Sequence, residues 1–372
     1  MHQFSPSRGA LVLALAALAA CDAPPTATRT APNQPEDVRA MVEAMGFRGD
    51  MVQDFGDYVL VEGDIRLSKA ELRANQLPGG GKTGPRYQYR TTNLVSSPKV
   101  HQIVVDVSGL SSVPGWQTAA RDALTQWSGI SGSYVKMVEG SPADITVSTT
   151  CTSSNVAAYA SFPSGGNPGA TVYVNTCFGY SVTSSQQLRN MVHELGHTLG
   201  FRHTNYTQLG ETAGTEGAIQ VTGTPTSGND ANSVMNGGTA LNSWIGFSTY
   251  DQTAVRALYW LPTVSSLSVT NSGGSPLIGW SAPLDATSFT VRLINYNSVN
   301  GNYQNRFFSP VGTTTGTSLL DSENAYTGLH DKCGVEGPDG NIYGGWYEYG
   351  IVAQYANGSS AEARIYAPIG EC

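Results

Sequence analysis

Charged residues are scarce in this sequence. The chain of 372 residues has 20 Lys and Arg and 28 Asp and Glu, which together make up 13% of its length. This share excludes a coiled coil, whose long helices need many more charged residues. The formal net charge is -8 and Lys and Arg form no runs. We therefore expect no nucleic acid partner, because binding successive phosphates takes several neighbouring cations.

Long hydrophobic runs are missing as well. The apolar run at residues 10–20 has eleven residues, whereas a helix needs about 20 to cross a bilayer. Membrane contact is therefore expected only through an N-terminal lipid. Hydrophobic residues make up 40% of the chain and aromatic residues 9%, which excludes a disordered protein. The length predicts two or three domains, and we expect a monomer.

The N-terminus has the pattern of a bacterial lipoprotein signal. Arg8 precedes the apolar run, which ends in Leu18-Ala19-Ala20-Cys21 and resembles a lipobox. The resemblance implies that residues 1–20 are removed, that Cys21 is lipidated and that residues 21–35 form a tether. The protein would then be exported and anchored in the cell envelope, in the periplasm or on the outer surface, or released outside the cell. An ordinary signal peptide with a cysteine nearby is the alternative.

Four cysteines follow the signal, namely Cys151, Cys177, Cys333 and Cys372. Export permits disulfides, and four cysteines allow three pairings. The first two flank one segment of the middle region, and the last two both lie near the C-terminus. We therefore predict disulfides between Cys151 and Cys177 and between Cys333 and Cys372. Reduced structural thiols are the alternative.

The rest of the chain divides into three parts, residues 36–88, 89–262 and 263–372. The first is a short region with its own apolar pattern, and it ends in a Gly-rich linker around residues 77–84. Such a linker is flexible and exposed, so Lys82 and Arg86 are expected protease targets.

The middle part, residues 89–262, mixes the patterns of strands and helices. Apolar residues recur at helical spacing from Trp116 to Trp127, and β-rich stretches predict strands at 102–107, 145–147 and 171–174. We expect an α+β domain with an antiparallel component.

The last part, residues 263–372, has no helical pattern. Short β-rich stretches alternate with turn residues, and Asn357-Gly358 is a strong hairpin signal. The expected strands are 264–269, 277–280, 289–294, 347–354 and 363–366. With Trp280 on an early strand, this all-β part resembles a fibronectin type III or immunoglobulin-like sandwich.

Three of the six histidines fall within the stretch from Val192 to His203. On a helix, His193 and His197 differ by about 40° of rotation and 6 Å of rise, so their imidazoles can share one metal ion. His203 would face the wrong side of a continuing helix. Gly200 resolves this, because a glycine there can take the left-handed conformation that ends a helix and turns the chain back. Surface histidines without a ligand are the alternative.

The helix itself is supported by residues outside the histidine pattern. Thr183 or Ser184 can cap its start, with Gln186 or Gln187 three residues further on. One apolar face is formed by Leu188, Val192, Leu195 and Leu199.

Three neutral imidazoles leave one open position on a tetrahedral Zn²⁺, which is typical of a catalytic site. One zinc ion per chain is therefore the expected cofactor, and it would activate a water and polarise a carbonyl. Glu194, next to the first histidine, is placed to take the proton from this water and pass it to a leaving amine. This chemistry suits a protein or peptide substrate.

The motif resembles that of the metzincin metallopeptidases. Met235 lies 32 residues after His203 in Ser233-Val234-Met235-Asn236, which is similar to the methionine turn beneath the metal of that family. An ordinary core methionine is the alternative. His193-Glu194-Leu195-Gly196-His197, with Gly223-Thr224-Pro225 further on, is most similar to the dual-action HEIGH metallopeptidases of the protease B type. The resemblance implies a zincin domain with a twisted mixed sheet and an active-site helix, closed by a helix at residues 248–259.

Astacins are a second relative by pattern. Their prosegment carries a Phe-X-Gly-Asp switch whose aspartate blocks the zinc, and Val61-Glu62-Gly63-Asp64 resembles it. The resemblance implies that residues 36–75 inhibit the enzyme until they are removed, so the protein would be a zymogen. Phe47-Arg48-Gly49-Asp50 also fits, and two plain Gly-Asp turns are a further alternative.

The astacin pattern has two more implications and two exceptions. Cys151 and Cys177 resemble a bridge that brackets the strands over the cleft, and 155–161 would be the edge strand that pairs with substrate. Astacins have Glu after the third histidine and Tyr two residues after the methionine, whereas this chain has Thr204 and Gly237. The residue that stabilises the oxyanion is therefore not identified by the pattern.

Zinc-dependent endopeptidase activity is the function that the sequence favours. A surface-anchored binding protein with a relict zinc site is the alternative from another class, and hydrolysis of a non-peptide amide is a third. A relict site has no reason to keep all three ligands and the base, which argues against the surface-anchored binding protein.

Overall fold

The computed structural model describes residues 38–44, 52–61, 64–69, 88–153, 155–226, 230–299, 302–322, 335–336 and 342–366. Several features predicted from the sequence lie outside these ranges. They are the signal peptide, the tether, the lipidation site Cys21, Asp50, the Gly-rich linker, Cys333 and Cys372. In the described part of the chain, no helix is both long enough and apolar enough to cross a membrane.

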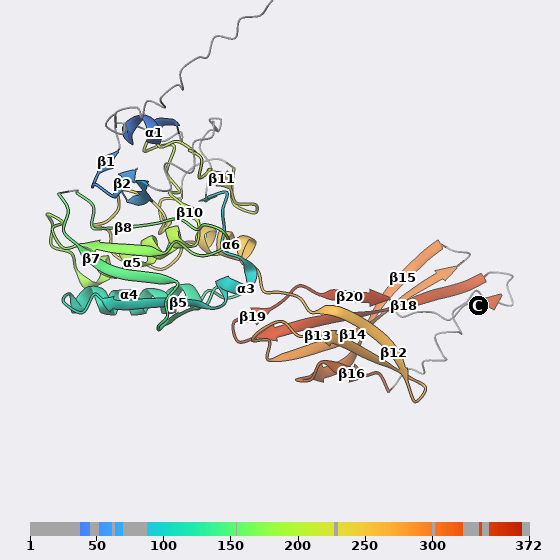
Figure 1. Cartoon of the computed structure of the whole chain (residues 1–372). Helices are drawn as coiled ribbons and strands as arrows, with labels where there is room; N and C mark the ends of the chain where they lie inside the picture. The colour runs from blue at the N-terminus through green and yellow to red at the C-terminus, as the bar shows by residue number, and fades with distance from the viewer. Residues whose placement is uncertain are drawn as a thin grey trace, which may run out of the picture. The chain divides into compact units, whose positions relative to one another are not determined.

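The central element is an eight-stranded sheet in the order β1-β2-β3-β8-β9-β7-β5-β6 (Figure 1). The strands after residue 88 are β5 (Ile103–Gly109), β6 (Met137–Glu139), β7 (Ile145–Thr150), β8 (Ala158–Ala160) and β9 (Thr171–Asn175). Strands β6, β5, β7 and β9 are parallel, and β8 is antiparallel to β9. The sheet is therefore mixed, and β5, β7 and β9 correspond to the three strands predicted from the sequence.

Helices α4 (Pro114–Ser128) and α5 (Ser184–Thr198) pack against each other in the main hydrophobic core. Trp127 is buried at the end of α4, and its indole Nε1 donates a hydrogen bond of 2.9 Å to the Val192 carbonyl of α5. The short helix α3 (Ser97–Val100) precedes β5, and α6 (Thr249–Leu258) follows the long loops after α5. The packing fixes α5, which carries the histidine motif, against the rest of the domain.

The segment before residue 70 adds three strands to the sheet. Helix α1 (Val38–Ala44) is followed by β1 (Gln53–Asp54), β2 (Tyr58–Val61) and β3 (Ile65–Ser68). Strands β1 to β3 pair antiparallel, and β3 joins the edge strand β8 in parallel orientation. These elements share a small core of their own, formed by Val38, Val42, Val59, Val61, Ile65, Leu67 and Phe162.

A second, small sheet lies beside the end of α5. Strand β4 (Tyr89–Arg90) is its centre, between β10 (Phe201–Arg202) and β11 (Ile219–Gln220). Because β10 leads directly into His203, this pairing fixes where the third histidine enters the site.

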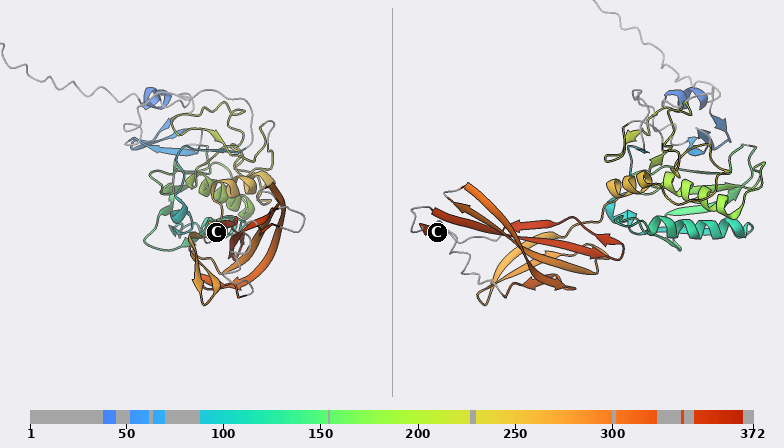
Figure 2. Two further views of the ribbon diagram at one scale, coloured as in Figure 1. Left: turned by 90° about the vertical axis from the view of Figure 1, so that its right-hand side faces the viewer. Right: turned by 180° about the vertical axis from the view of Figure 1, so that it is seen from behind.

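The residues after 262 form antiparallel sheets, as seen from two sides in Figure 2. One sheet contains β12 (Ser265–Ser272), β13 (Ser275–Ser281) and β16 (Ser318–Leu320). The other contains β14 (Ser288–Val299), β15 (Asn302–Thr314), β17 (Val335–Glu336) and β18 (Ile342–Tyr355), with β19 (Gly358–Ser359) and β20 (Ala363–Tyr366) paired to β18. No helix is present in the described residues of this part. Its assignment to the fibronectin type III class remains a prediction.

Candidate metal centre

Helix α5 carries the first two histidines and begins at a capping box. The Thr183 hydroxyl accepts a hydrogen bond from the Gln186 backbone N–H, and the Gln186 side chain accepts one from the Thr183 N–H. These two bonds satisfy backbone donors that a helix start leaves free. On its apolar face, Val192, Leu195 and Leu199 are fully buried. Capping and burial together fix both the start and the rotation of the helix.

Gly200 ends the helix and turns the chain. Its φ is +96°, in the left-handed region that glycine adopts without strain. Its N–H donates to the His197 carbonyl at 2.9 Å, and its own carbonyl accepts from the Thr91 N–H at 2.8 Å. The chain then continues into β10 and delivers His203 to the face of α5 that carries His193 and His197.

The three imidazoles converge on one point. The side chains of His193, His197 and His203 are at least 95% buried, and each offers a nitrogen to a cluster whose members lie within 4.8 Å of one another. The Nε2 atoms of His193 and His203 are 3.2 Å apart. Such a spacing of nitrogens fits binding of a single ion, since zinc bonds to imidazole nitrogen at about 2.0–2.1 Å.

Each imidazole is oriented from behind through its Nδ1 atom. His193 Nδ1 lies 2.8 Å from the Val234 carbonyl oxygen, and His197 Nδ1 lies 2.8 Å from the Phe201 carbonyl oxygen. His203 Nδ1 lies 2.7 Å from the carboxylate of Glu211. An acceptor at Nδ1 holds a proton there, so that Nε2 is the nitrogen that can bind a metal once it has given up any proton of its own.

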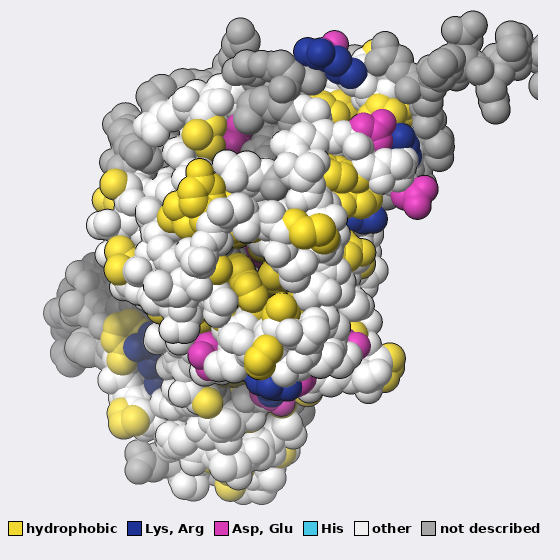
Figure 3. Space-filling model, turned by 90° about the vertical axis from the view of Figure 1, so that its left-hand side faces the viewer, with side chains coloured by type: hydrophobic (Ala, Val, Ile, Leu, Met, Phe, Trp, Pro, Cys, Tyr) yellow, Lys and Arg dark blue, Asp and Glu magenta, His cyan; other side chains and the backbone are white. Residues whose placement is uncertain are grey.

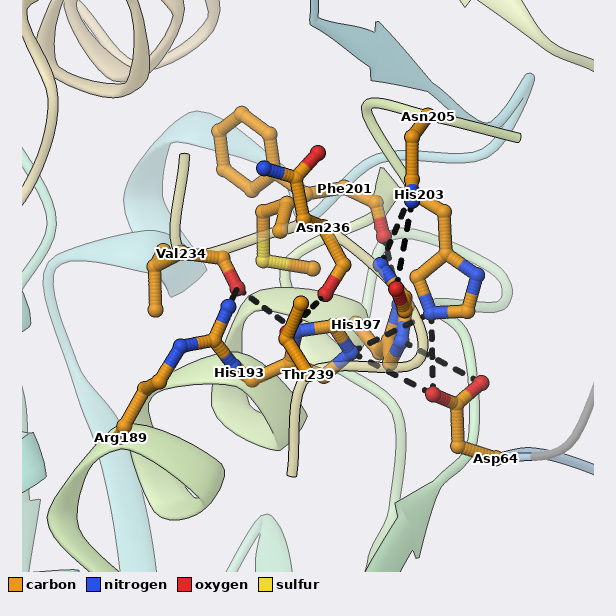
Figure 4. A network of polar contacts seen from close by, with 12 residues as sticks. Asp64, Arg189, His193, His197, Phe201, His203, Asn205, Val234, Asn236 and Thr239 are labelled. Atoms are coloured by element: carbon orange, nitrogen blue, oxygen red, sulfur yellow. Dashed lines mark hydrogen bonds and ion pairs between the residues drawn. The ribbon is translucent and has the colours of Figure 1, made fainter. Parts of the chain in front are cut away.

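Asp64, directly before β3, is the fourth member of the cluster, and its carboxylate faces the three imidazoles (Figure 4). One of its carboxylate oxygens lies 2.9 Å from His203 Nε2 and 3.4 Å from His193 Nε2, and the other lies 3.8 Å from His197 Nε2. Burial raises the pKa of Asp64, but the charge of His203 and hydrogen bonds from His193 and His203 outweigh burial and hold this pKa well below its usual value. Asp64 is therefore a carboxylate in this site.

The donors present fit a metal ion. His197 Nε2 and one oxygen of Asp64 are buried without a hydrogen-bond partner in the described part of the chain. Buried polar atoms in proteins nearly always have a partner, so two such atoms aimed at one point indicate a missing ligand. Three imidazole nitrogens and one carboxylate oxygen are a donor set that suits tetrahedral Zn²⁺.

Glu194 follows the first histidine and is 2% exposed. One of its carboxylate oxygens is buried with no hydrogen-bond partner among the described residues. Burial, and after it the charge of Asp64, raise the pKa of Glu194 well above its usual value. Burial and the neighbouring Asp64 carboxylate therefore both make it easier for Glu194 to hold a proton.

The turn at Met235 lies beneath the histidines. Its carbonyl accepts a hydrogen bond of 2.8 Å from the Thr204 N–H, directly after the third histidine. The Val234 carbonyl meets His193 Nδ1, and the Val234 N–H donates to the buried carboxylate of Asp251 at the start of α6. Met235 itself is 1% exposed and belongs to the main core. The turn therefore connects α6 to the metal centre.

A family model described as dual-action HEIGH metallo-peptidase matches residues 59–259, more than half of the chain. The chain belongs to this family. It is by family a zinc metalloendopeptidase, a hydrolase of peptide bonds, and its own site has the donors of a metal centre.

Solved structures give weaker likenesses. A structure of myroilysin is similar at 18% identity, covering 42% of this chain and 79% of that chain with a TM-score of 0.29. High choriolytic enzyme 1, a hatching enzyme zinc-protease from the medaka fish Oryzias latipes, is similar at 16% identity, covering 44% of this chain and 92% of that chain, also with a TM-score of 0.29. No curated protein matches the chain.

Two features of this HEIGH metallopeptidase site could not be read from the motif. Glu211, the partner of His203, lies in a loop eight residues further on and shows no periodic pattern. Gly237 stands where astacins have a tyrosine, and a Cβ atom there would lie 2.7 Å from His203 Nδ1. A side chain at position 237 is therefore excluded by the place of the third histidine.

The cleft beside the metal centre is bordered by β8 and by the loop that the predicted disulfide closes. The structure contains a disulfide between Cys151 and Cys177. Strand β8 lies within the predicted edge strand 155–161, and its outer edge is paired with β3 at Ile65 and Ala160. Figure 3 shows one face of the molecule, on which Lys and Arg side chains form a few separate groups, several of them beside Asp and Glu side chains.

Proposed function

We propose that this metallopeptidase is a zinc-dependent endopeptidase made as a latent precursor, with Asp64 as the inhibitory group. The convergence of three imidazole Nε2 atoms with the Asp64 carboxylate carries the proposal. His193, His197 and His203 would hold the zinc ion. Asp64 would take the fourth position on the ion, which is the one that catalysis needs.

A bound zinc ion supplies Lewis acidity, which polarises the scissile carbonyl and acidifies a water. The chain's own residues supply the rest. Glu194 accepts a proton from the attacking water and gives it to the amide nitrogen as the peptide bond breaks. Its position next to His193 on α5 keeps its carboxylate at the metal centre.

Two contacts of the Asp64 segment support latency. The carboxylate stands among the ligand nitrogens, and the Asp64 backbone carbonyl accepts a hydrogen bond of 3.0 Å from the Ala160 N–H of β8. Strand β3 therefore uses the edge to which an extended substrate could add by backbone pairing. Removal of residues 36–75 would free both the fourth ligand position and this edge. Cleavage is expected in the linker at Lys82 or Arg86.

The direct test is digestion of a denatured protein by the purified, zinc-loaded chain. We expect self-cleavage near Lys82 to activate the latent chain first, and substrate fragments to appear after it only when no chelator is present. A Glu194→Gln chain should bind zinc with unchanged stoichiometry and produce no fragments. Asp64→Ala should raise the activity of the unprocessed chain, because the fourth ligand position becomes free. Cleavage retained by Glu194→Gln, or an unprocessed Asp64→Ala chain as inactive as the parent, would contradict the respective role.

The remaining parts of the proposal concern the ends of the chain. We propose that Cys21 carries a lipid that anchors the protein in the bacterial cell envelope, and that 263–372 is a separate sandwich module of the fibronectin type III or immunoglobulin-like class. The lipobox-like stretch Leu18-Ala19-Ala20-Cys21 supports the anchor, and the antiparallel sheets after residue 262 support the sandwich. A Cys21→Ser protein should leave the membrane fraction, and its continued recovery there would refute the anchor.

A further inference from the structure

A cavity of about 390 Å³ opens beside the metal centre. Helix α5 contributes Arg189 and Asn190 to its wall, β8 and the residues before it contribute 155–158, and the segment after the methionine turn contributes Asn236 and residues 238–242. His193 and Glu194 line it as well. A side chain of the substrate that enters this cavity therefore belongs to a residue next to the scissile bond.

Among the described residues, Arg189 is the one Lys or Arg that lines this cavity. It lies one helical turn before His193 and is 6% exposed. Its Nη2 donates to the Val234 carbonyl at 3.1 Å and to the Ser233 carbonyl at 3.4 Å, as Figure 4 shows for Val234. An arginine has five N–H donors, and Nε and Nη1 of Arg189 make no hydrogen bond to any described residue.

The charge of this guanidinium persists despite its burial. Burial lowers the pKa of Arg189 to about 10, while the charges of Asp251 and Glu194 oppose this shift. Arg189 therefore remains a cation at neutral pH. Asp251 is occupied by Ser233 and the Val234 N–H, and Glu194 serves the metal centre. Neither carboxylate forms a hydrogen bond with Arg189 in the described part of the chain.

The sheet edge indicates which substrate residue faces the cavity. We take the substrate strand to run antiparallel to β8, which is the slightly more stable pairing and is opposite to the direction of β3, whose pairing with β8 is parallel. Its chain then passes from the Ala160 end of β8 towards Val156 and Asn155, which line the cavity. In this direction the chain that follows the scissile bond passes along the cavity that Arg189, His193 and Glu194 line.

We propose that Arg189 makes this peptidase selective for an acidic residue directly after the scissile bond. The inference rests on the proposed endopeptidase function and specifies its substrate class. A substrate carboxylate would accept charge-assisted hydrogen bonds from Nε and Nη1 of Arg189, which are stronger than the bonds that a neutral amide accepts. Because Glu194 lines the same cavity and repels a carboxylate, the selectivity depends on direct bonds rather than on net charge.

The test uses the zinc-loaded full chain, activated by limited proteolysis within residues 70–87. Peptide pairs differ only by Asp against Asn, or Glu against Gln, after the cleaved bond. We expect kcat/KM to be at least about tenfold higher for the acid, given the usual strength of hydrogen bonds to charged groups. Arg189→Gln should bring this ratio to about one, and Arg189→Lys should restore part of it. As a control, the same exchange of acid for amide is made four residues away from the cleaved bond.

The ratio does not depend on the absolute rate of a variant, so partial loss of activity does not obscure it. If Arg189→Gln fails to fold, Arg189→Lys gives the comparison, and its ratio should fall below that of the parent chain because lysine lacks the fixed pair of donors of arginine. A ratio near one in the parent chain, or an unchanged ratio in Arg189→Gln, overturns the inference. A chain that cleaves no peptide refutes the proposed function itself, whereas cleavage without acid selectivity refutes this inference alone.

Discussion

At the scale of single residues, the acceptors behind the imidazoles decide how well the site can hold a metal. Two of the three are backbone carbonyls, which the fold supplies whatever the side chain. The third is the Glu211 carboxylate, which is fully buried against His203. A carboxylate in this place increases the basicity of the imidazole and fixes its orientation.

Glu211 should therefore affect zinc binding although it does not touch the ion. We expect Glu211→Ala to weaken zinc affinity by about 10–100-fold, the usual effect of losing such a partner. Glu211→Gln keeps an acceptor but loses the charge, so its zinc affinity should fall between those of the parent chain and Glu211→Ala. Competition with a chromophoric chelator measures the affinities, and thermal melting of the metal-free chains controls for misfolding. Equal affinities in all three chains would show that Glu211 has no role at the site.

The sequence predicted the residues of the site unevenly, for physical reasons. His193, His197 and Glu194 follow from helical geometry, and Gly200 from the reversal that His203 requires. Asp64 was predicted by resemblance, with Asp50 left open, and the structure brings Asp64 to the imidazoles. Glu211 was missed because a loop has no period, so nothing in the sequence indicates which of its side chains turns inward.

At the scale of elements, the two ends of α5 have different tasks. The N-terminal end is closed by the Thr183 capping box, which stabilises the helix but lies three turns from the nearest ligand. The C-terminal end at Gly200 both stops the helix and brings His203 back to the site. Substitutions at the two ends should therefore separate stability from metal binding.

We expect Gly200→Ala to lower both the free energy of unfolding and the affinity for zinc. A residue with a Cβ at φ +96° costs about 1–2 kcal/mol, and the added Cβ would lie 2.9 Å from Thr91 Oγ1 and from Leu94 Cδ2. Thr183→Ala should lower the free energy of unfolding by about 1 kcal/mol and leave zinc affinity unchanged. Denaturant titrations and zinc competition on both variants make the comparison. Zinc affinity in Gly200→Ala equal to that of the parent would refute the role of this turn.

The elements that local patterns specify were predicted well. Helix α5, helix α4 and strands β5, β7 and β9 have clear periods and burial that agree with them. The pairing of β3 with β8 could not be predicted from a pattern, because it rests on one pair of residues, Ile65 and Ala160, that are far apart in the chain. Likewise, the parallel order of β6, β5, β7 and β9 depends on crossovers that no local signal encodes.

At the scale of the whole molecule, the metal centre connects distant parts of the chain. Its donors come from α5, from the residue after β10 and from the residue before β3. Their supports come from the methionine turn, β10 and the Glu211 loop. An ion bound by these groups in the folded chain alone stabilises the fold, by about 4 kcal/mol when its concentration is a thousand times Kd.

Removal of the metal should therefore lower the thermal midpoint of unfolding. We expect a chelator to lower the Tm of the zinc-loaded chain by several degrees, and re-addition of zinc to restore it. A His203→Ala chain, which lacks one ligand, should show a much smaller difference between the two conditions. Differential scanning calorimetry at one protein concentration gives both values. A chelator that leaves the Tm of the parent chain unchanged would contradict a metal centre that connects distant parts of the chain.

X-ray absorption at the zinc edge of the purified, zinc-loaded chain tests the central claim most directly. The account predicts one zinc per chain with three imidazole nitrogens and one oxygen at about 2.0–2.1 Å. A chain that binds no zinc, or a spectrum with fewer than three imidazoles around the ion, would contradict it.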